Sequence, residues 1–124
     1  MGGRVAYLVP SADRRIAASV SYYGGNTRVA WGDGPAPFER LAEIRCPILG
    51  LFGEEDRNPT PDDRDAIDQR LSEHRVPHEF HSFANAGHAY MDFTRPEHHS
   101  QEAADASWPL TIAFLEQHIG HAGR

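Results

Sequence analysis

Short apolar runs alternate with longer apolar segments of helical spacing along the chain. Residues 16–23 and 48–52 form near-continuous apolar runs, and residues 78–83 alternate apolar with polar side chains before an Asn-Ala-Gly turn. Each of these segments has the length and composition of a β-strand, and the first is expected to be buried on both faces. The pattern therefore predicts three strands.

Apolar residues at helical spacing occupy the segments around these strands. The first helix is expected to stop at Pro10, because proline lacks the backbone N–H that continues a helix. Thr60 or Asp62 can cap the third helix, which runs to about His74. In the last helix, Trp108 is expected to pack in the core against the sheet. The predicted helices span residues 1–9, 38–44, about 61–74 and 100–119.

The predicted helices and strands therefore alternate along the whole chain. Such alternation is typical of right-handed crossover connections and a parallel sheet. We expect an α/β fold with about three parallel strands and flanking helices, in a single domain over residues 1–124. A sheet this narrow has open edges.

Two ionisable residues follow neighbouring strands at the same end of the predicted sheet. Asp56 lies in the turn after residues 48–52, and His88 lies in the loop after residues 78–83. Ligands of open α/β sheets collect at the carboxyl ends of strands. A histidine can take a proton there near neutral pH, and a carboxylate can orient its ring. This order suits a nucleophile–acid–histidine triad, whose nucleophile is missing from these residues.

Each of these residues also has an ordinary structural alternative. Asp56 suits an Asx-turn, in which the carboxylate binds a backbone N–H two residues further on, and Glu55 is a rival for the acid role. The alternative for His88 is a loop histidine that is hydrogen-bonded to the backbone. We favour the catalytic interpretation because His88 follows a strand and a small-residue turn and has an aromatic neighbour.

Several motifs occur together in this chain, at residues 1–6, 20–25, 47–56 and 86–90. With Ala103, Ala104 and Trp108 of the last helix, they resemble the dienelactone hydrolase family of α/β hydrolases. The resemblance runs over nearly the whole chain and covers only the C-terminal half of the family's domain. It implies a partial α/β-hydrolase fold.

The nucleophile turn of that family reads Gly-x-Cys-x-Gly-Gly, and Met1-Gly2-Gly3 resembles its tail. The resemblance implies a nucleophile immediately before Met1, outside this sequence, with Asp56 as the acid and His88 as the general base. It also implies that the backbone N–H of Met1 is one oxyanion donor. The implied activity is hydrolysis of a small-molecule carboxylic ester or lactone through an acyl-enzyme, without a cofactor.

Aromatic residues near these positions are candidates for an acyl pocket. Tyr22 and Tyr23 stand at a strand end beside two glycines, and Tyr90 closely follows His88. Core packing is the alternative for these rings. The dienelactone enzymes carry an arginine four residues after the histidine to hold a substrate carboxylate, whereas this chain has Asp92 there. An acid would repel that carboxylate, so dienelactone itself is a poor fit.

The histidines do not form a recognisable metal-binding pattern. His98 and His99 lie near Glu102, and His118 pairs similarly with His121. No third or fourth ligand has zinc-like spacing, so we expect these to be surface residues and predict no metal site.

The single cysteine, Cys46, excludes an internal disulfide and fits the reducing cytoplasm. It precedes Pro47 at the start of a strand, at the end of the sheet opposite Asp56. We expect a buried structural thiol rather than a nucleophile.

Composition narrows the range of partners. The chain has 18 acidic and 12 basic residues, a formal net charge of −6, which disfavours nucleic acid and anionic membranes. We expect no signal peptide, and no apolar run approaches the ~20 residues that span a bilayer. The alternative function is a truncated, non-catalytic α/β scaffold that forms a homodimer through an exposed sheet edge.

Overall fold

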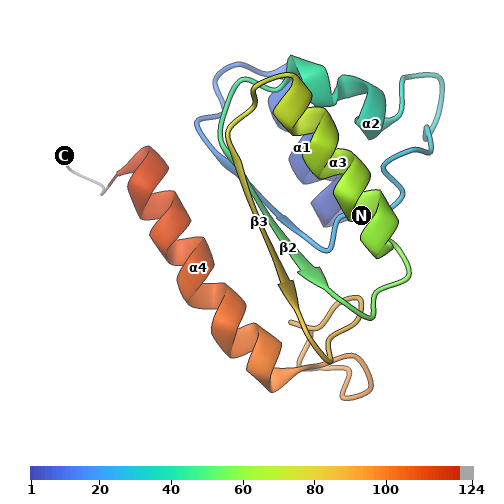
Figure 1. Ribbon diagram of the computed structural model, residues 1–124, viewed down its shortest axis with the longest axis vertical. Helices are drawn as coiled ribbons and strands as arrows, with labels where there is room; N and C mark the ends of the chain where they lie inside the picture. Colours follow the sequence, from blue (N-terminus) through green and yellow to red (C-terminus); the bar gives the residue numbers. More distant parts are fainter. Residues whose placement is uncertain (121–124) are drawn as a thin grey trace.

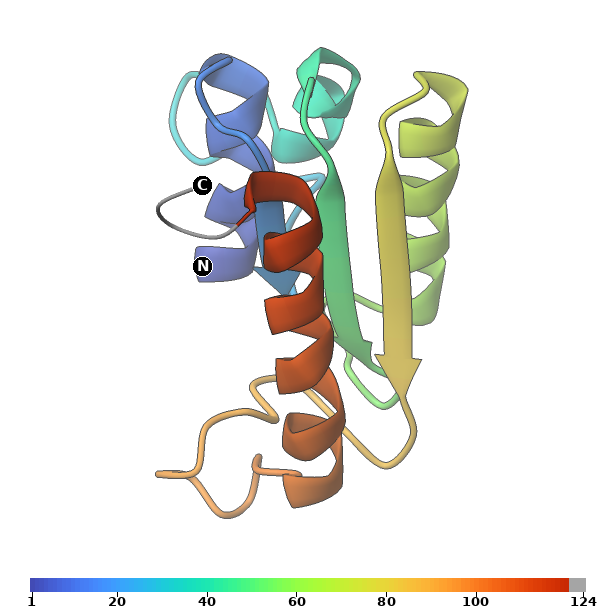
Figure 2. The same cartoon turned by 90° about the vertical axis from the view of Figure 1, so that its left-hand side faces the viewer.

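The sheet of this chain has three parallel strands in the order β1–β2–β3, with helices on both faces (Figures 1 and 2). The computed structural model describes residues 1–120, and it confirms the predicted α/β fold. The elements in chain order are α1 (Gly2–Ala12), β1 (Ser19–Tyr22), α2 (Pro37–Arg40), the 3-10 helix η1 (Leu41–Glu43), β2 (Ile48–Gly53), α3 (Pro61–Glu73), β3 (His78–Phe83) and α4 (Gln101–Ile119).

Two layers of helix enclose the sheet. Helices α1, α2 and α3 cover one face and α4 covers the other (Figure 2). On the first face, Tyr7 of α1 and Ile67 of α3 share a buried core with Ile48 of β2. On the second face, Phe114 of α4 packs with Leu49. The central strand β2 therefore contributes to both cores, and every one of its residues is buried.

The first strand is more exposed than predicted, because it lies at an edge of the sheet. In β1 only Ser21 is buried, and its hydroxyl donates to the carbonyl of Gly3 in α1 over 2.8 Å. Val20 and Tyr22 pack against the α4 side of the sheet and are only half-buried. The expectation of burial on both faces is therefore wrong.

Pro10 lies inside α1 rather than ending it, so that prediction is also wrong. A proline in a helix leaves the carbonyl four residues earlier without its N–H partner. In α1 that carbonyl belongs to Ala6, and the hydroxyl of Ser19 donates to it over 2.6 Å. The first strand thus supplies the hydrogen bond that Pro10 removes, and α1 continues to Ala12.

The third helix begins as predicted, with Thr60 as its cap. The hydroxyl of Thr60 accepts the N–H of Asp63 over 3.1 Å, and the Asp63 carboxylate accepts the N–H of Thr60 over 3.0 Å. This reciprocal pair is a capping box, which satisfies two N–H groups at the helix start.

Trp108 does not pack in the core, which corrects the prediction for α4. Its side chain is 54% exposed. The buried positions of this helix include Ser107 and Thr111, whose hydroxyls donate to the carbonyls of Ala103 and Ser107 in the same helix. These small polar residues are satisfied within α4 and can therefore be buried, whereas Trp108 lies at the surface of the molecule.

None of the helices in the described part of the chain is long and apolar enough to cross a bilayer. The predicted pairing of His118 with His121 lies outside the described residues, since these end at residue 120.

The hydrogen bond between Ser19 and Ala6 predicts non-additive stability changes. Ser19→Ala should lower the free energy of unfolding by about 1–2 kcal/mol, because the Ala6 carbonyl loses its donor. In a Pro10→Ala background the new N–H can bond that carbonyl, and the loss should fall below about 0.5 kcal/mol. Urea denaturation of the four proteins measures both values. Equal losses in the two backgrounds would contradict the account of Pro10.

Gly53 predicts a second change in stability. A Cβ at this position would stand 2.6 Å from the carbonyl carbon of Ala86, in backbone that cannot give way as a side chain would. Gly53→Ala should therefore lower the free energy of unfolding by about 2 kcal/mol or more. The control is Gly34→Ala, where no atom lies within 4 Å of the new Cβ and the change should stay within about 0.5 kcal/mol. Similar losses in both variants would argue against the close approach at Gly53.

Candidate active site

Backbone hydrogen bonds join the loops that follow β2 and β3. The N–H of Glu54 donates to the carbonyl of Phe83 over 3.0 Å, and the N–H of Glu55 donates to the carbonyl of Ala86 over 2.9 Å. These bonds continue beyond the last pair of the parallel register, Gly53 with Phe83. The two loops that carry the predicted acid and histidine are therefore hydrogen-bonded to each other at the carboxyl ends of the strands (Figure 1).

Beyond these strand ends, Asp56 and His88 are in direct contact. Nδ1 of His88 lies 3.0 Å from Oδ2 of Asp56. The Asp56 side chain is 1% exposed, whereas that of His88 is 48% exposed. With Nδ1 facing the carboxylate, Nε2 is the ring nitrogen left for a reacting group. This is the arrangement in which a carboxylate orients an imidazole and stabilises its protonated form.

Asp56 also makes the Asx-turn that was its structural alternative. Its Oδ1 accepts the N–H of Asn58 over 2.8 Å, while Oδ2 faces His88. The two contacts use different oxygens, so both hold in the same structure. Glu54 and Glu55 are exposed, and neither forms the contact with His88.

Of the predicted pocket tyrosines, Tyr23 lies beside His88 and Tyr22 lies beside Tyr23. The Tyr23 ring packs on the His88 ring with centroids 5.2 Å apart, and on the Tyr22 ring with centroids 5.9 Å apart. Burial, aided by the nearby Tyr22 and the charge of Asp92, raises the pKa of Tyr23, so its hydroxyl stays neutral at physiological pH. The Tyr22 hydroxyl lies 2.5 Å from Oγ1 of Thr111, which fixes this ring against α4.

Tyr90 is placed differently from the expectation that it lines the pocket. Its side chain is fully buried, in a small core with Ala86 and Ala103. Its ring meets the Tyr23 ring edge-on, with centroids 5.3 Å apart, and burial raises the pKa of its hydroxyl. Tyr90 therefore supports Tyr23 from the core and has no surface on the pocket.

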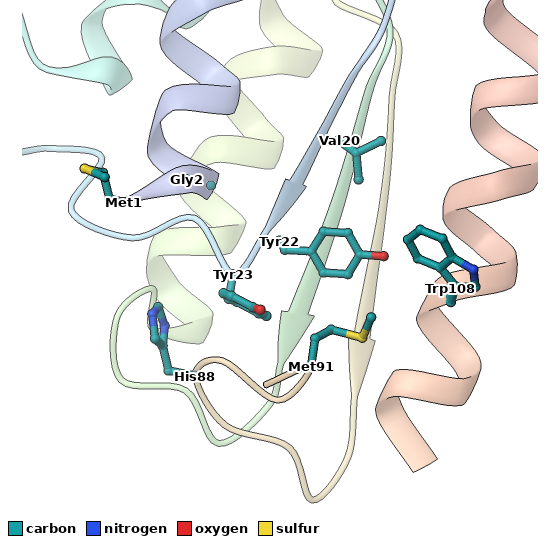
Figure 3. A pocket seen from close by; sticks show the side chains of 9 residues that line it. Met1, Gly2, Val20, Tyr22, Tyr23, His88, Met91 and Trp108 are labelled. Atoms are coloured by element: carbon teal, nitrogen blue, oxygen red, sulfur yellow. The ribbon is translucent and has the colours of Figure 1, made fainter. Parts of the chain in front are cut away.

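A pocket of about 390 Å³ opens beside His88. Figure 3 shows Tyr22 from β1, Met91 from the loop after β3 and Trp108 from α4 gathered around it. Most of the lining is apolar or aromatic, and His88 is its only titratable side chain within residues 1–120 besides the two tyrosines. The lining residues are Met1, Gly2, Gly3, Val20, Tyr22, Tyr23, His88, Met91 and Trp108.

The amino terminus of α1 borders the same pocket. Met1 is the N-cap of α1, and no side chain of the described residues caps this helix end. The first N–H groups of a helix have no partner within it, and they give this end a partial positive charge. Gly2 leaves open space at this helix end, and Gly3 allows the close approach of the Gly24 backbone. The expected oxyanion donor at Met1 therefore lies on the same pocket as His88.

Asp92 and Arg95 form their own local structure. Oδ1 of Asp92 accepts the N–H of Thr94 over 3.0 Å, and hydrogen bonds from Thr94 lower the pKa of this carboxyl. Nε of Arg95 lies 3.8 Å from Oδ2 of Asp92. Arg95 is thus held at its own carboxylate, and it is not among the residues that line the pocket.

Cys46 is buried in the core beneath α1 and α3, with a free thiol, as predicted. Burial raises the pKa of this thiol, which disfavours the reactive thiolate. No group of three or more histidine, cysteine, aspartate or glutamate side chains within residues 1–120 has a metal-binding arrangement.

Two polar residues that were not predicted as site residues, Asn58 and Arg4, bind the loop after β1. Asn58 touches both Asp56 and the loop after β1 through hydrogen bonds. Arg4 is 3% exposed, and its guanidinium lies 4.0 Å over the Trp31 ring. The signal available for Arg4 was a lone charge in an apolar helical run, whereas Asn58 has no distinguishing pattern.

Comparison with known proteins places this geometry in a family. A family described as the dienelactone hydrolase family matches residues 1–119. A carboxymethylenebutenolidase of Rhodococcus opacus is 29% identical over 122 residues, which cover 96% of this chain and 48% of that protein. A protein of Escherichia coli K12 named "Putative carboxymethylenebutenolidase" is 28% identical over 120 residues, 96% of this chain and 44% of its own length.

The solved structures agree in fold. The crystal structure of a "Putative Dienelactone Hydrolase" from Klebsiella pneumoniae superposes with a TM-score of 0.82 at 24% identity, and covers 94% of this chain and 48% of that one. The chain thus spans less than half the length of these proteins. Since the family match extends over nearly all of its residues, the chain belongs to the dienelactone hydrolase family.

Proposed function

We propose that this chain supplies the acid and the histidine of a triad that hydrolyses a small-molecule carboxylic ester or lactone. In this proposal Asp56 orients His88, and a cysteine or serine that immediately precedes Met1 is the nucleophile. The observation that carries the proposal is the contact of 3.0 Å between a buried carboxylate and a half-exposed imidazole, on a pocket bordered by the start of α1. Membership of a hydrolase family supports it.

The proposed mechanism follows from what each group can do. Nε2 of His88 takes the proton of the nucleophile as it attacks the ester carbonyl, and Asp56 stabilises the imidazolium that forms. The backbone N–H of Met1, within the peptide bond to the nucleophile, donates to the oxyanion. His88 then gives its proton to the leaving alcohol. A water molecule activated by the same nitrogen hydrolyses the acyl-enzyme.

The pocket lining favours an uncharged substrate. Tyr22, Tyr23 and Met91 offer aromatic and apolar surface in the same pocket as His88, and the charge of the Asp92 carboxylate acts on Tyr23. No arginine of the described residues lines this pocket. An ester without a free carboxylate therefore fits these walls better than dienelactone does.

The proposal predicts distinct effects of replacing the acid and its rival. In the chain extended by the residues encoded upstream of Met1, Asp56→Asn should lower kcat for 4-nitrophenyl acetate by roughly 10³-fold or more, as loss of a triad acid does. His88→Ala should lower it at least as far. Glu55→Gln is the control and should stay within about twofold. A large loss in Glu55→Gln with normal turnover in Asp56→Asn would transfer the acid role to Glu55.

The missing nucleophile gives a separate prediction. Residues 1–124 alone should show no burst of 4-nitrophenol that depends on His88, because they hold a base and its orienting acid without the attacking group. The reading frame upstream of Met1 should end in Gly-x-Cys or Gly-x-Ser. A burst from residues 1–124 that His88→Ala abolishes, or an upstream sequence without either residue, would refute the proposed position of the nucleophile.

One observation favours the alternative, a non-catalytic scaffold that self-associates. Apolar side chains of α1 and α4 are exposed near the open edge of β1, namely Val5, Val9, Trp108 and Ile112. Exposed apolar surface of this kind is typical of an interface. Size-exclusion chromatography with light scattering measures the mass of residues 1–124 directly, and a stable monomer would count against this alternative.

A further inference from the structure

Four hydrogen bonds connect the first turn of α1 to His88 by way of Asp56. Nη1 of Arg4 donates to the carbonyl of Asn26 over 2.5 Å, and the N–H of Asn26 donates to Oδ1 of Asn58 over 2.8 Å. The N–H of Asn58 donates to Oδ1 of Asp56 over 2.8 Å. The other oxygen of Asp56 lies 3.0 Å from Nδ1 of His88. The loops after β1 and β2 are thus linked to each other and to the pair.

Asn58 is the residue at which these two loops meet. Its main chain belongs to the turn of Asp56, and its side chain receives a backbone N–H from the loop after β1. The loops also touch through backbone, since a Cβ at Gly25 would lie 2.5 Å from the Asn58 carbonyl oxygen. An Asx-turn at Asp56 accounts for the Asn58 N–H but not for the bond to its side chain.

Arg4 fixes the other side of this contact. Besides Asn26, its Nη1 donates to the carbonyl of Val29 over 2.6 Å, and its guanidinium lies over the Trp31 ring. No carboxylate pairs with Arg4 in the part of the chain that the structure describes. This buried cation therefore binds carbonyl oxygens of the loop after β1, and it holds that loop against the start of α1.

We infer that Asn58 is a positioning residue for the reaction, which acts by holding the Asp56 turn against the loop that Arg4 anchors. The inference rests on the proposed function, because it concerns how Asp56 orients His88. A carboxylate on a turn that can shift would hold the imidazole in several orientations. Small displacements of a catalytic group lower the rate constant of the chemical step far more than they change substrate binding.

The test is a double-mutant cycle on the extended, active protein, with kcat and KM for 4-nitrophenyl acetate measured for each variant. Asn58→Ala should lower kcat about 10-fold or more, with KM within about twofold. In an Asp56→Asn background, adding Asn58→Ala should lower kcat by less than about twofold, because its effect passes through Asp56. Asn58→Asp, which keeps an oxygen acceptor for the Asn26 N–H, should stay within about threefold of the starting protein.

Glu54→Gln, an exposed change in the same turn, is the matched control, and thermal unfolding confirms that each variant is folded. The same fold-loss from Asn58→Ala in both backgrounds would overturn the inference, since Asn58 would then act independently of Asp56. A loss in Asn58→Asp as large as that in Asn58→Ala would also overturn it. If Asp56→Asn alone leaves kcat unchanged, the proposed function fails instead.

Discussion

The parallel pairing of β2 with β3 is the constraint on which this site depends. The register ends at Gly53 and Phe83, and two further backbone bonds, from Glu54 and Glu55, carry the pairing into the loops beyond. Gly53 permits this close approach because it has no Cβ to meet the Ala86 backbone. Side chains that lie 32 positions apart in the sequence are thereby brought into hydrogen-bonding distance.

The two side chains of this contact differ in their exposure to solvent. The Asp56 carboxylate is withdrawn from solvent but accepts two hydrogen-bonding partners, one on each oxygen. Hydrogen bonds to both oxygens hold the buried carboxylate in one orientation, and the imidazole beside it remains half-exposed. The aromatic ring of Tyr23 lies against His88, with Tyr90 packed behind Tyr23. The pair is therefore supported from the core, and His88 reaches the pocket beside Tyr22 and Tyr23.

The alternation of apolar runs was sufficient to predict the three strands, their parallel direction and the strand-end positions of Asp56 and His88. It failed where the outcome depended on which direction a single side chain faces. Trp108 is a large apolar residue of the kind usually found in a core, yet Ser107 and Thr111 of α4 are buried instead. These two can be buried because their hydroxyls bond within the helix. Tyr90 likewise follows His88 closely but turns into the core.

Other features were beyond local reasoning because they join distant segments. Pro10 is accommodated in α1, where Ser19 on a separate element donates to the carbonyl that the proline leaves free. The contacts of Arg4 and Asn58 connect the start of α1, the loop after β1 and the loop after β2. No regular spacing in the sequence relates these three segments. Sequence patterns report periodicity within an element, whereas these bonds depend on how the elements pack.

The most direct test of the central claim is the protonation pattern of the His88 ring, measured by two-dimensional ¹H–¹⁵N NMR near neutral pH. The contact with Asp56 predicts that neutral His88 carries its proton on Nδ1, because the ring nitrogen beside a carboxylate acts as the donor. Asp56→Ala should remove that preference. A proton found on Nε2 in the unchanged protein, or a pattern that Asp56→Ala does not alter, would contradict the account.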